Sequence, residues 1–439
     1  MTKMKYMRVF QTLLAFSGNA PPQLALTREL VERGHEVRVL AHSAARERID
    51  RTGAEFVAIR GWLPELDITH PETDPIRDWE ARTPLGAAKR MRDAPIAPLR
   101  DATRENIEQL GDWSADVVVF DWLFIAAAVA AEAVGIPAVA LVHCPYPFPV
   151  AGAPPLFSGL KPMGGPVGAA RDRLLNAMTR RFSQAGLPVL NDVRAEHGLT
   201  PLEHWNDQVL GVRAIYVMTA PELDFSSKAE LPANVHYTGP AFEPFQKDWE
   251  SPWPEENTDP LVLLSFSTSY MDQGALAQRA LDAVAGLPVR ALLTAGPALD
   301  ANRLRIPANA RTVAFVPHRT VLPHASLVVT HAGWQTVNAA VADGVPLVCI
   351  PDGRDQPDNA ARVLVAHAGV RANKKSSPEK LRRVISQALE DQSIKQGARA
   401  MADALARSDG AIVMADALER LPVGNSVKAT TPLRSPAAG

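Results

Sequence analysis

Short runs of consecutive apolar residues alternate with helical stretches along this chain, and no other feature constrains its fold as strongly. The run ADVVVF at residues 115–120, for example, is apolar at successive positions, so both faces of the strand that it forms must be buried. Parallel sheets that carry helices on both faces bury their strands in this way. We therefore expect a doubly wound α/β architecture built on parallel sheets.

The alternation occurs twice, and 439 residues suit two domains of similar size that face each other across a cleft. The expected strands are residues 7–16, 37–40, 115–120 and 137–142 in the first half, and 261–266, 289–294, 312–316, 327–330 and 346–350 in the second. Helices are expected at Pro22–Arg33 and Phe124–Val134, with Gly34 and Gly135 ending them. We expect an N-terminal domain at residues 1–241, a proline-rich linker at 242–260, a C-terminal domain at 261–421 and a disordered tail at 422–439.

Charge and cysteine content narrow the choice of partners and of compartment. A net charge of -2 gives no electrostatic reason to expect a nucleic acid or an anionic membrane as a partner. The N-terminal apolar run is too short to span a bilayer, and no small-residue cleavage site follows it. Cys144 and Cys349 lie in or beside apolar runs, which favours buried thiols in a reducing compartment. A cytoplasmic monomer or homodimer is the expectation.

Polar residues follow two expected strands of the second domain. Thr330 leads into HAGWQT at residues 331–336, where a helix begins, and free backbone N–H groups beside a glycine can bind an anion such as phosphate. The strand at 346–350 leads into PDGRDQ at residues 351–356, with carboxylates, a guanidinium and an amide. Together these segments suit a diphosphate that carries a polyhydroxylated group, although a turn with satisfied hydrogen bonds is an alternative interpretation of HAGWQT alone.

These segments resemble the sugar-donor signature of the GT-B, family 1-type glycosyltransferases, the superfamily of plant secondary-metabolite and actinobacterial natural-product enzymes. The matching motifs occur in order: FVPH at 315–318, THAGWQT at 330–336, GVP at 344–346 and the pair Asp355-Gln356. In the first half, TRELVERGHEV at 27–37 and the pair Gly239-Pro240 also match. The resemblance covers nearly the whole chain, to about Leu421.

The resemblance implies two Rossmann-like domains and an inverting, metal-independent transfer of a sugar, such as a hexose, from a UDP- or dTDP-sugar to a hydrophobic or aromatic small molecule. It implies no cofactor besides this co-substrate and no metal site. Phe315 would stack on the base, His331 and the helix start near Gly333 would hold the pyrophosphate, and Asp355 with Gln356 would bind sugar hydroxyls. The predicted donor-binding residues are Ser267, Thr268, Gly296, Phe315, Val316, His318, His331, Gly333, Trp334, Gln335, Thr336, Asp355 and Gln356.

The catalytic position departs from the family pattern. Many members carry G-H-x-x-P in the first loop, where the histidine is the general base, whereas this chain has GNAPP at residues 18–22. Asn19 stands at the position of the base, and an amide cannot accept a proton at neutral pH. The acid that normally orients the histidine matches Asp121.

Three interpretations of this loss are open. In the first, Asp121 acts as the base, directly or through a water, while Asn19 positions the acceptor. In the second, the acceptor ionises easily or attacks through an electron-rich carbon, so that O- and C-glycosylation are both open. In the third, the chain binds a sugar nucleotide without turning it over.

The predicted acceptor-binding residues are Asn19, Trp122, His143 and Phe148, and aromatic residues in 62–98 and after His143 favour an apolar acceptor. His143 could also supply the base, although a lone histidine is more often structural. Ala339 replaces a glutamate that binds ribose in many UDP-sugar enzymes of this family, so a dTDP-sugar is as plausible as a UDP-sugar. The rival classes are a GT-B-fold epimerase or phosphorylase, a sugar-nucleotide-binding auxiliary protein and, since GxGxxG is absent, more distantly an NAD-dependent enzyme.

Overall fold

The fold is described from a computed structural model of the chain, which describes residues 6–13, 18–63, 70–74, 76–244, 248–267 and 269–421. Thr268, a predicted donor-binding residue, lies outside the described residues. The predicted tail at 422–439 and residues 14–16 of the first expected strand also lie outside them.

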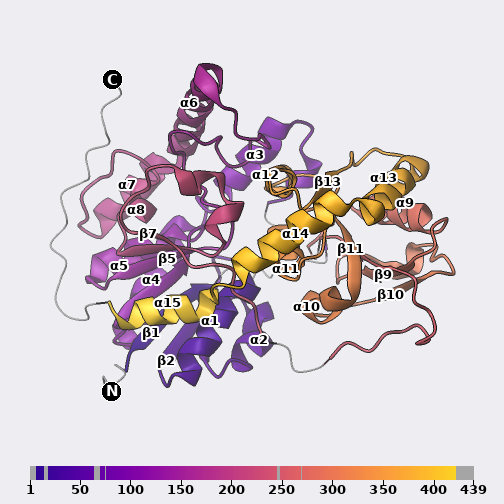
Figure 1. Ribbon diagram of the computed structural model, residues 1–439. Helices are drawn as coiled ribbons and strands as arrows, with labels where there is room; N and C mark the ends of the chain where they lie inside the picture. Colours follow the sequence, from indigo (N-terminus) through magenta and orange to yellow (C-terminus); the bar gives the residue numbers. More distant parts are fainter. Residues whose placement is uncertain are drawn as a thin grey trace.

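The N-terminal half of the chain forms a parallel sheet in the order β3-β2-β1-β4-β5-β6-β7 (Figure 1). Its strands are β1 (Arg8–Leu13), β2 (Glu36–Ala41), β3 (Glu55–Ala58), β4 (Val117–Asp121), β5 (Ala138–Val142), β6 (Ala214–Val217) and β7 (Val235–Tyr237). The chain winds outward from β1 in one direction and then, from β4, in the other. β4 and β5 are therefore neighbours, and their carboxyl ends meet at one edge of the sheet.

The C-terminal half forms a second parallel sheet in the order β10-β9-β8-β11-β12-β13. Its strands are β8 (Leu261–Ser265), β9 (Arg290–Thr294), β10 (Ala310–Val313), β11 (Ala325–Thr330), β12 (Leu347–Cys349) and β13 (Gly369–Arg371). The expected pair of doubly wound parallel sheets is confirmed. The strands β3, β6, β7 and β13 were not predicted from the sequence. β10 ends at Val313 and does not reach Val316, whose conformation the following Pro317 restricts.

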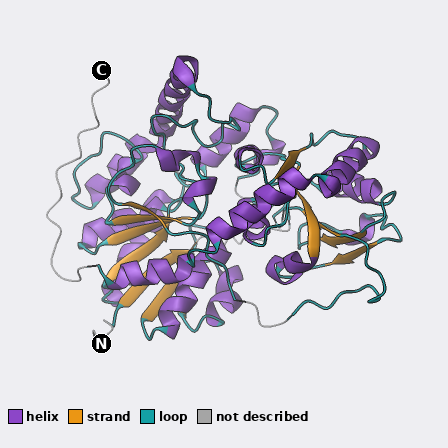
Figure 2. Cartoon of the chain, viewed as in Figure 1, coloured by secondary structure: helices purple, strands orange, loops and turns teal. Residues whose placement is uncertain are grey.

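Helices cover both sheets (Figure 2). They are α1 (Ala20–Glu32), α2 (Arg46–Asp50), α3 (Pro84–Asp93), α4 (Leu99–Asp112), α5 (Ile125–Val134), α6 (Gly165–Ser183), α7 (Leu187–Glu196), α8 (Asp207–Leu210), α9 (Gly274–Val284), α10 (His318–Val321), α11 (Trp334–Ala342), α12 (Gln356–Val365), α13 (Pro378–Glu390), α14 (Gln392–Leu405) and α15 (Gly410–Glu419). α5 ends at Gly135 with φ of 74°, in the left-handed region that glycine adopts without a steric cost.

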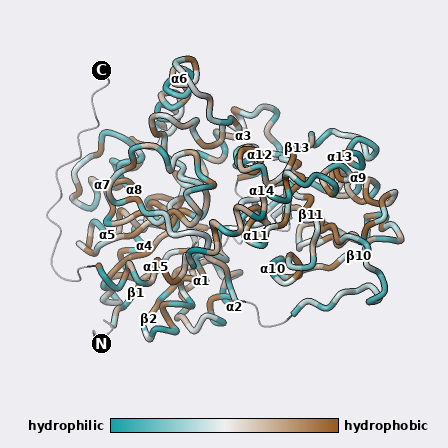
Figure 3. The backbone as a smooth tube through the Cα atoms, in the orientation of Figure 1, coloured by the Kyte–Doolittle hydropathy of each residue, from teal (hydrophilic) through white to brown (hydrophobic). Residues whose placement is uncertain are grey.

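Successive side chains of β4 enter two different hydrophobic cores. Val117 and Val119 pack with α1 and α15, whereas Val118 and Phe120 pack with α4 and α5. This two-sided burial explains the uninterrupted apolar run in the sequence. Figure 3 shows segments coloured as apolar within both halves of the molecule. None of the helices that the structure describes is long and apolar enough to cross a membrane.

Two segments connect the halves of the molecule. After the C-terminal sheet the chain returns along α14 and packs α15 against α1, where Arg33 donates to Asp416 at 2.6 Å (Figure 1). In the expected linker, the described residues form no helix or strand, yet Trp253 is buried and lies near the guanidinium of Arg290, which belongs to the C-terminal sheet. Cys144 and Cys349 are buried free thiols, as the sequence predicted.

Candidate active site between the two domains

The loop between β11 and α11 leaves the backbone N–H groups at the start of that helix without a capping side chain. Ala332 adopts φ of 71°, and its N–H donates to Oγ1 of Thr330 at 3.2 Å, which turns the chain sharply after the strand. Gly333 occupies the N-cap position of α11 and offers no side chain to cap the helix. Gln335 and Thr336, both half-buried, lie in the first turn of α11, whereas Trp334 is buried among apolar side chains.

His331 fills the space beside this helix start. A Cβ atom on Gly333 would lie 2.5 Å from Nε2 of His331, so the close approach of the imidazole to the backbone requires glycine. His331 is only 7% exposed, and its burial lowers the pKa of the imidazole to about 4. The side chain is therefore neutral at neutral pH, and it can offer a hydrogen bond to an anion but no full positive charge.

The segment after β12 also ends at a helix. Asp355 is the N-cap residue of α12, and its carboxylate accepts a hydrogen bond from Nδ2 of Asn359 at 2.8 Å. The Gln356 side chain is buried, and its Oε1 accepts from the backbone N–H groups of Asp352 and Gly353 at 2.8 and 3.1 Å. The side-chain carbonyl of Gln356 thus stabilises the loop that precedes α12. The Asp355 side chain is half-buried.

The predicted base-binding residues gather at the ends of β9 and β10. Phe315 is 76% exposed, and the N–H of Gly296 donates to the Ala314 carbonyl at 2.9 Å, which places the end of β9 beside it. Nε2 of His318 lies 3.2 Å from Oγ1 of Thr294, and burial lowers the pKa of His318 to about 4. Val316 is half-buried. Ser267, after β8, has its hydroxyl 3.1 Å from that of Ser269.

Asp121, the last residue of β4, is completely buried. Its carboxylate accepts a hydrogen bond from Nε2 of Gln23 at 2.7 Å and from the N–H of Leu123 at 3.0 Å. Oδ2 also lies 3.3 Å from Nδ1 of His143, the first residue after β5. The acid that the sequence analysis left without a histidine therefore has one, because adjacent parallel strands bring their carboxyl ends together.

Asn19 lies at the start of α1, where its backbone carbonyl accepts a hydrogen bond from Nε2 of Gln23 at 3.0 Å. Gln23 thus joins the first loop to Asp121. Gln23 was not among the predicted site residues, although it lies four residues after Asn19 and therefore on the same face of the expected helix.

The two domains meet where these groups gather. Nε2 of Gln335, in the first turn of α11, donates to the backbone carbonyl of His143 at 3.2 Å. A Cβ atom on Gly18, in the first loop, would lie 3.8 Å from Cγ of the same glutamine. Gln335, predicted for the sugar donor, and His143, predicted for the acceptor, are therefore in contact across the domain boundary.

Aromatic side chains surround His143 on the N-terminal side. The rings of Trp122 and Phe148 lie 5.8 Å apart in an edge arrangement, and Trp122 lies 6.5 Å from the His143 ring. Trp122 and Phe148 also line a small cavity of about 60 Å³, together with Pro95, Leu123, Ile125, Trp205, Asn206 and Val209. The predicted acceptor-binding aromatic residues thus contact one another beside the histidine.

Three ion-pair or packing contacts across the boundary were not predicted from the sequence. Arg354 donates to Asp78 at 2.8 Å, and Trp79 packs edge-on against Tyr270 with ring centroids 5.4 Å apart. A buried contact of 3.3 Å joins Arg362 of α12 to Asp224. A single residue carries no sequence signal of its partner when the two come from different domains.

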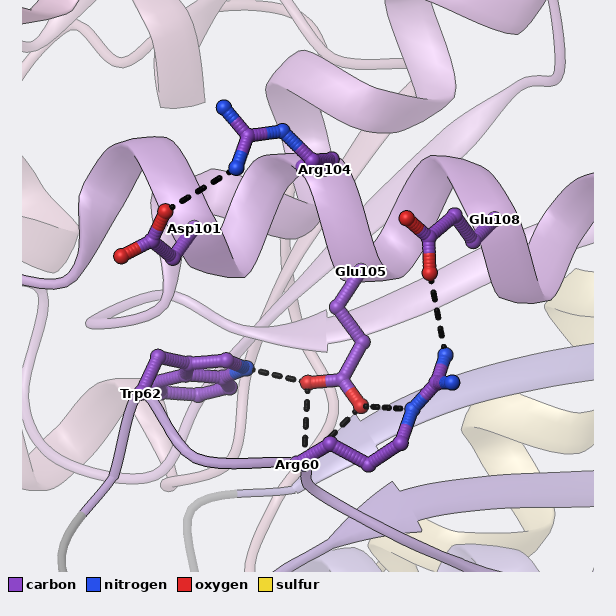
Figure 4. A pocket seen from close by; sticks show the side chains of 6 residues that line it. All are labelled: Arg60, Trp62, Asp101, Arg104, Glu105 and Glu108. Atoms are coloured by element: carbon purple, nitrogen blue, oxygen red, sulfur yellow. Dashed lines mark hydrogen bonds and ion pairs between the residues drawn. The ribbon is translucent and has the colours of Figure 1, made fainter.

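A second hollow, of about 280 Å³, lies over α4 (Figure 4). Figure 4 shows its charged side chains paired with one another: Arg60 contacts Glu105 and Glu108, and Arg104 contacts Asp101. Trp62, which donates to Glu105, stacks on Phe124 at 4.9 Å. Each charged side chain in the hollow thus has an oppositely charged partner, and Arg60 is shared by two glutamates. Among the described residues, no group of His, Cys, Asp or Glu is arranged to hold a metal ion.

Comparisons with known proteins agree with this fold. Residues 278–421 match the family of Erythromycin biosynthesis protein CIII-like C-terminal domains. The chain is 29% identical over 422 residues to 4'-demethylrebeccamycin synthase of Lentzea aerocolonigenes, an alignment that covers 94% of this chain and 99% of that protein.

Two solved structures share the fold. The calicheamicin glycosyltransferase CalG4 has a TM-score of 0.74 at 21% identity over 95% of this chain and 98% of its own. The glycosyltransferase VinC in complex with DTDP has a TM-score of 0.65 at 21% identity over 94% of this chain and 98% of its own. Fold, motif order and relatives together define a GT-B glycosyltransferase. More closely, the chain is similar to the natural-product glycosyltransferases of actinobacteria.

Proposed function

We propose that this glycosyltransferase moves a sugar, such as a hexose, from a dTDP- or UDP-sugar to a hydrophobic or aromatic small molecule, with inversion at the anomeric carbon and without a metal ion. One observation carries the proposal. Gln335, in the first turn of α11, contacts the backbone of His143 beside Asp121, so a diphosphate at the helix start would lie next to the catalytic residues of the N-terminal domain.

Direct displacement places negative charge on the leaving diphosphate. The free N–H groups at the start of α11 and the neutral His331 would stabilise this charge by hydrogen bonds in a largely buried site. The exposed Phe315 would stack on the base, and Asp355 would accept hydrogen bonds from sugar hydroxyls. This assignment needs no metal ion to balance the charge.

We favour a dTDP-sugar over a UDP-sugar. Ala339 is buried in α11 and offers no carboxylate to ribose hydroxyls, so the site has no evident preference for ribose over deoxyribose. The structural relative VinC was solved with DTDP, which supports the same choice. The cluster of Trp122 and Phe148 beside His143 supports an aromatic acceptor. Cytoplasmic location and a monomeric or homodimeric state stay predictions.

Titration calorimetry with dTDP and UDP, followed by mass detection of products from dTDP-glucose, UDP-glucose and a panel of phenolic acceptors, tests the proposal. We expect dTDP to bind and a hexose adduct to form on an aromatic acceptor in the presence of a chelator. Acid-labile products would indicate O-glycosides, and acid-stable products C-glycosides. The proposal fails if neither nucleotide binds, or if the sugar nucleotide is converted without any acceptor.

A further inference from the structure

We propose that His143 is the general base of this enzyme and that Asp121 is a positioning residue that orients its ring and stabilises the imidazolium that forms during transfer. The inference rests on the proposed function, and it replaces the assignment of Asp121 as the base. It is carried by the placement of the two side chains at the adjacent carboxyl ends of β4 and β5.

Asp121 cannot itself reach an acceptor in this structure. Its side chain has no exposed surface, and both carboxylate oxygens are engaged: Oδ1 by the N–H of Leu123, and Oδ2 by Nε2 of Gln23. A group that is enclosed in this way can hold a charge or a partner, but it does not contact a bound substrate. The general base must therefore be another side chain, one that lies beside Asp121 and is oriented by its carboxylate.

His143 meets that requirement. Its Nδ1 is buried and has no aligned hydrogen bond to a described residue, yet it lies 3.3 Å from Oδ2 of Asp121. A small rotation of the ring would align Nδ1–H with the carboxylate, and such catalytic contacts are often long before substrate binds. The carboxylate then fixes the Nδ1–H tautomer, which leaves the lone pair on Nε2. No hydrogen bond to a described residue engages Nε2.

The surroundings of His143 match the two substrates. Its backbone carbonyl accepts from Gln335 at 3.2 Å, so the histidine adjoins the helix start where the leaving diphosphate would lie. Trp122, whose ring centroid lies 6.5 Å from that of His143, forms an aromatic wall together with Phe148. A hydroxyl held against this wall would have the base and the anomeric carbon as neighbours.

The step balances without a further reagent. Nε2 of His143 takes the proton of the acceptor hydroxyl while its oxygen forms the new bond to the anomeric carbon. The bond from that carbon to the diphosphate oxygen breaks, and its electron pair leaves with the diphosphate. The resulting imidazolium is compensated by the Asp121 carboxylate and later loses its proton to solvent.

The first test compares acceptors of different acidity. With dTDP-glucose, His143→Gln should lower the rate with phenol at least about 100-fold, because phenol must lose a proton during attack. The rate with 4-nitrophenol, ionised at the assay pH, should fall less than about tenfold, and the Kd for dTDP should stay within about threefold. The matched control is His236→Gln, an exposed histidine on β7, which should change neither rate.

The second test needs no acceptor. Nitrogen-15 spectra of the imidazole, assigned by loss of signals in His143→Gln, should show Nδ1 protonated and Nε2 unprotonated in the wild type, with this preference lost in Asp121→Asn. An unprotonated Nδ1 in the wild type, or an equal loss of both transfer rates in His143→Gln, would overturn the inference. If the wild type neither transfers sugar nor binds dTDP, the proposed function is overturned instead. The spectra would still decide whether His143 and Asp121 form a hydrogen-bonded pair.

Discussion

The guanidinium of Arg354, in the loop before α12, donates to the carboxylate of Asp78 in the N-terminal domain at 2.8 Å. Asp74 lies 3.6 Å from the same group, and Asp74 and Asp78 are both buried. Arg354 itself adopts φ of 53°, in a region that non-glycine residues rarely occupy. The contact therefore holds a strained loop next to Asp355 against the other domain.

We predict that Asp78→Ala and Arg354→Ala each destabilise the protein by about 1–3 kcal/mol, because each leaves a partly or fully buried charge without its main hydrogen-bond partner. The double variant should cost at least about 1 kcal/mol less than the sum of the two. Thermal unfolding of the four proteins measures this coupling. The control is the exposed pair Arg51 and Glu47, 63% and 82% exposed, where the coupling should stay below about 0.5 kcal/mol. Strict additivity at Asp78 and Arg354 would contradict the prediction.

Asp358 of α12 should make stability depend on pH. Burial raises the pKa of its carboxyl from 3.8 to about 6, and Oδ2 has no hydrogen-bond partner among the described residues. Because the folded pKa is the higher one, the stabilisation from the protonated acid is complete below about 3.8 and is lost as the pH rises through about 6.

In the wild type the Gly159 N–H donates to Oδ1 of Asp358 at 3.1 Å. Asp358→Asn keeps an oxygen that can accept this hydrogen bond, and the new side chain carries no charge. We expect this variant to be more stable than the wild type at about pH 8, by up to about 3 kcal/mol, with the difference shrinking toward about pH 4. Urea unfolding at several pH values measures it, with the exposed Asp50→Asn as a control that should show no such trend. A less stable Asp358→Asn at about pH 8 would refute the argument.

His331 should bind the diphosphate as a neutral hydrogen-bond donor. Since its pKa is lowered to about 4, it gains no charge between about pH 8 and pH 6. We predict that His331→Gln weakens dTDP binding about tenfold and that the ratio of variant to wild-type Kd is constant over this range. Calorimetry at each pH measures the ratio. A ratio that grows toward pH 6 would mean that the imidazole titrates near its ordinary pKa.

Phe315 should matter for nucleotide binding and not for folding. It is 76% exposed, so Phe315→Ala removes little buried surface and should change the free energy of unfolding by less than about 0.5 kcal/mol. Loss of stacking on the base should cost about 1–3 kcal/mol of dTDP binding, or roughly a 5- to 150-fold rise in Kd. Ile306→Ala, at an exposed site of the same domain, should leave the Kd unchanged. A Kd that is equally insensitive to Phe315→Ala would exclude stacking.

The sequence by itself determined the architecture and the motif segments. Apolar runs such as residues 115–120 require burial on both faces, and local signals such as Gly135 after α5 end helices, because these effects depend only on neighbouring residues. The order of the motifs at 315–318, 330–336 and 355–356 likewise needs no coordinates. Short strands such as β7 and β13 were not predicted, because a strand of three residues carries too little hydrophobic periodicity.

Only the tertiary structure decided which side chains meet. His143 and Asp121 are separated by a helix in the sequence and become neighbours because β4 and β5 pair in parallel. Gln23 reaches Asp121 from α1, and Gln335 reaches His143 from the other domain. The sequence gives the chemical character of each residue, but strand order and domain packing determine which residue becomes its partner. Those depend on the free energy of the whole fold and not on any local pattern.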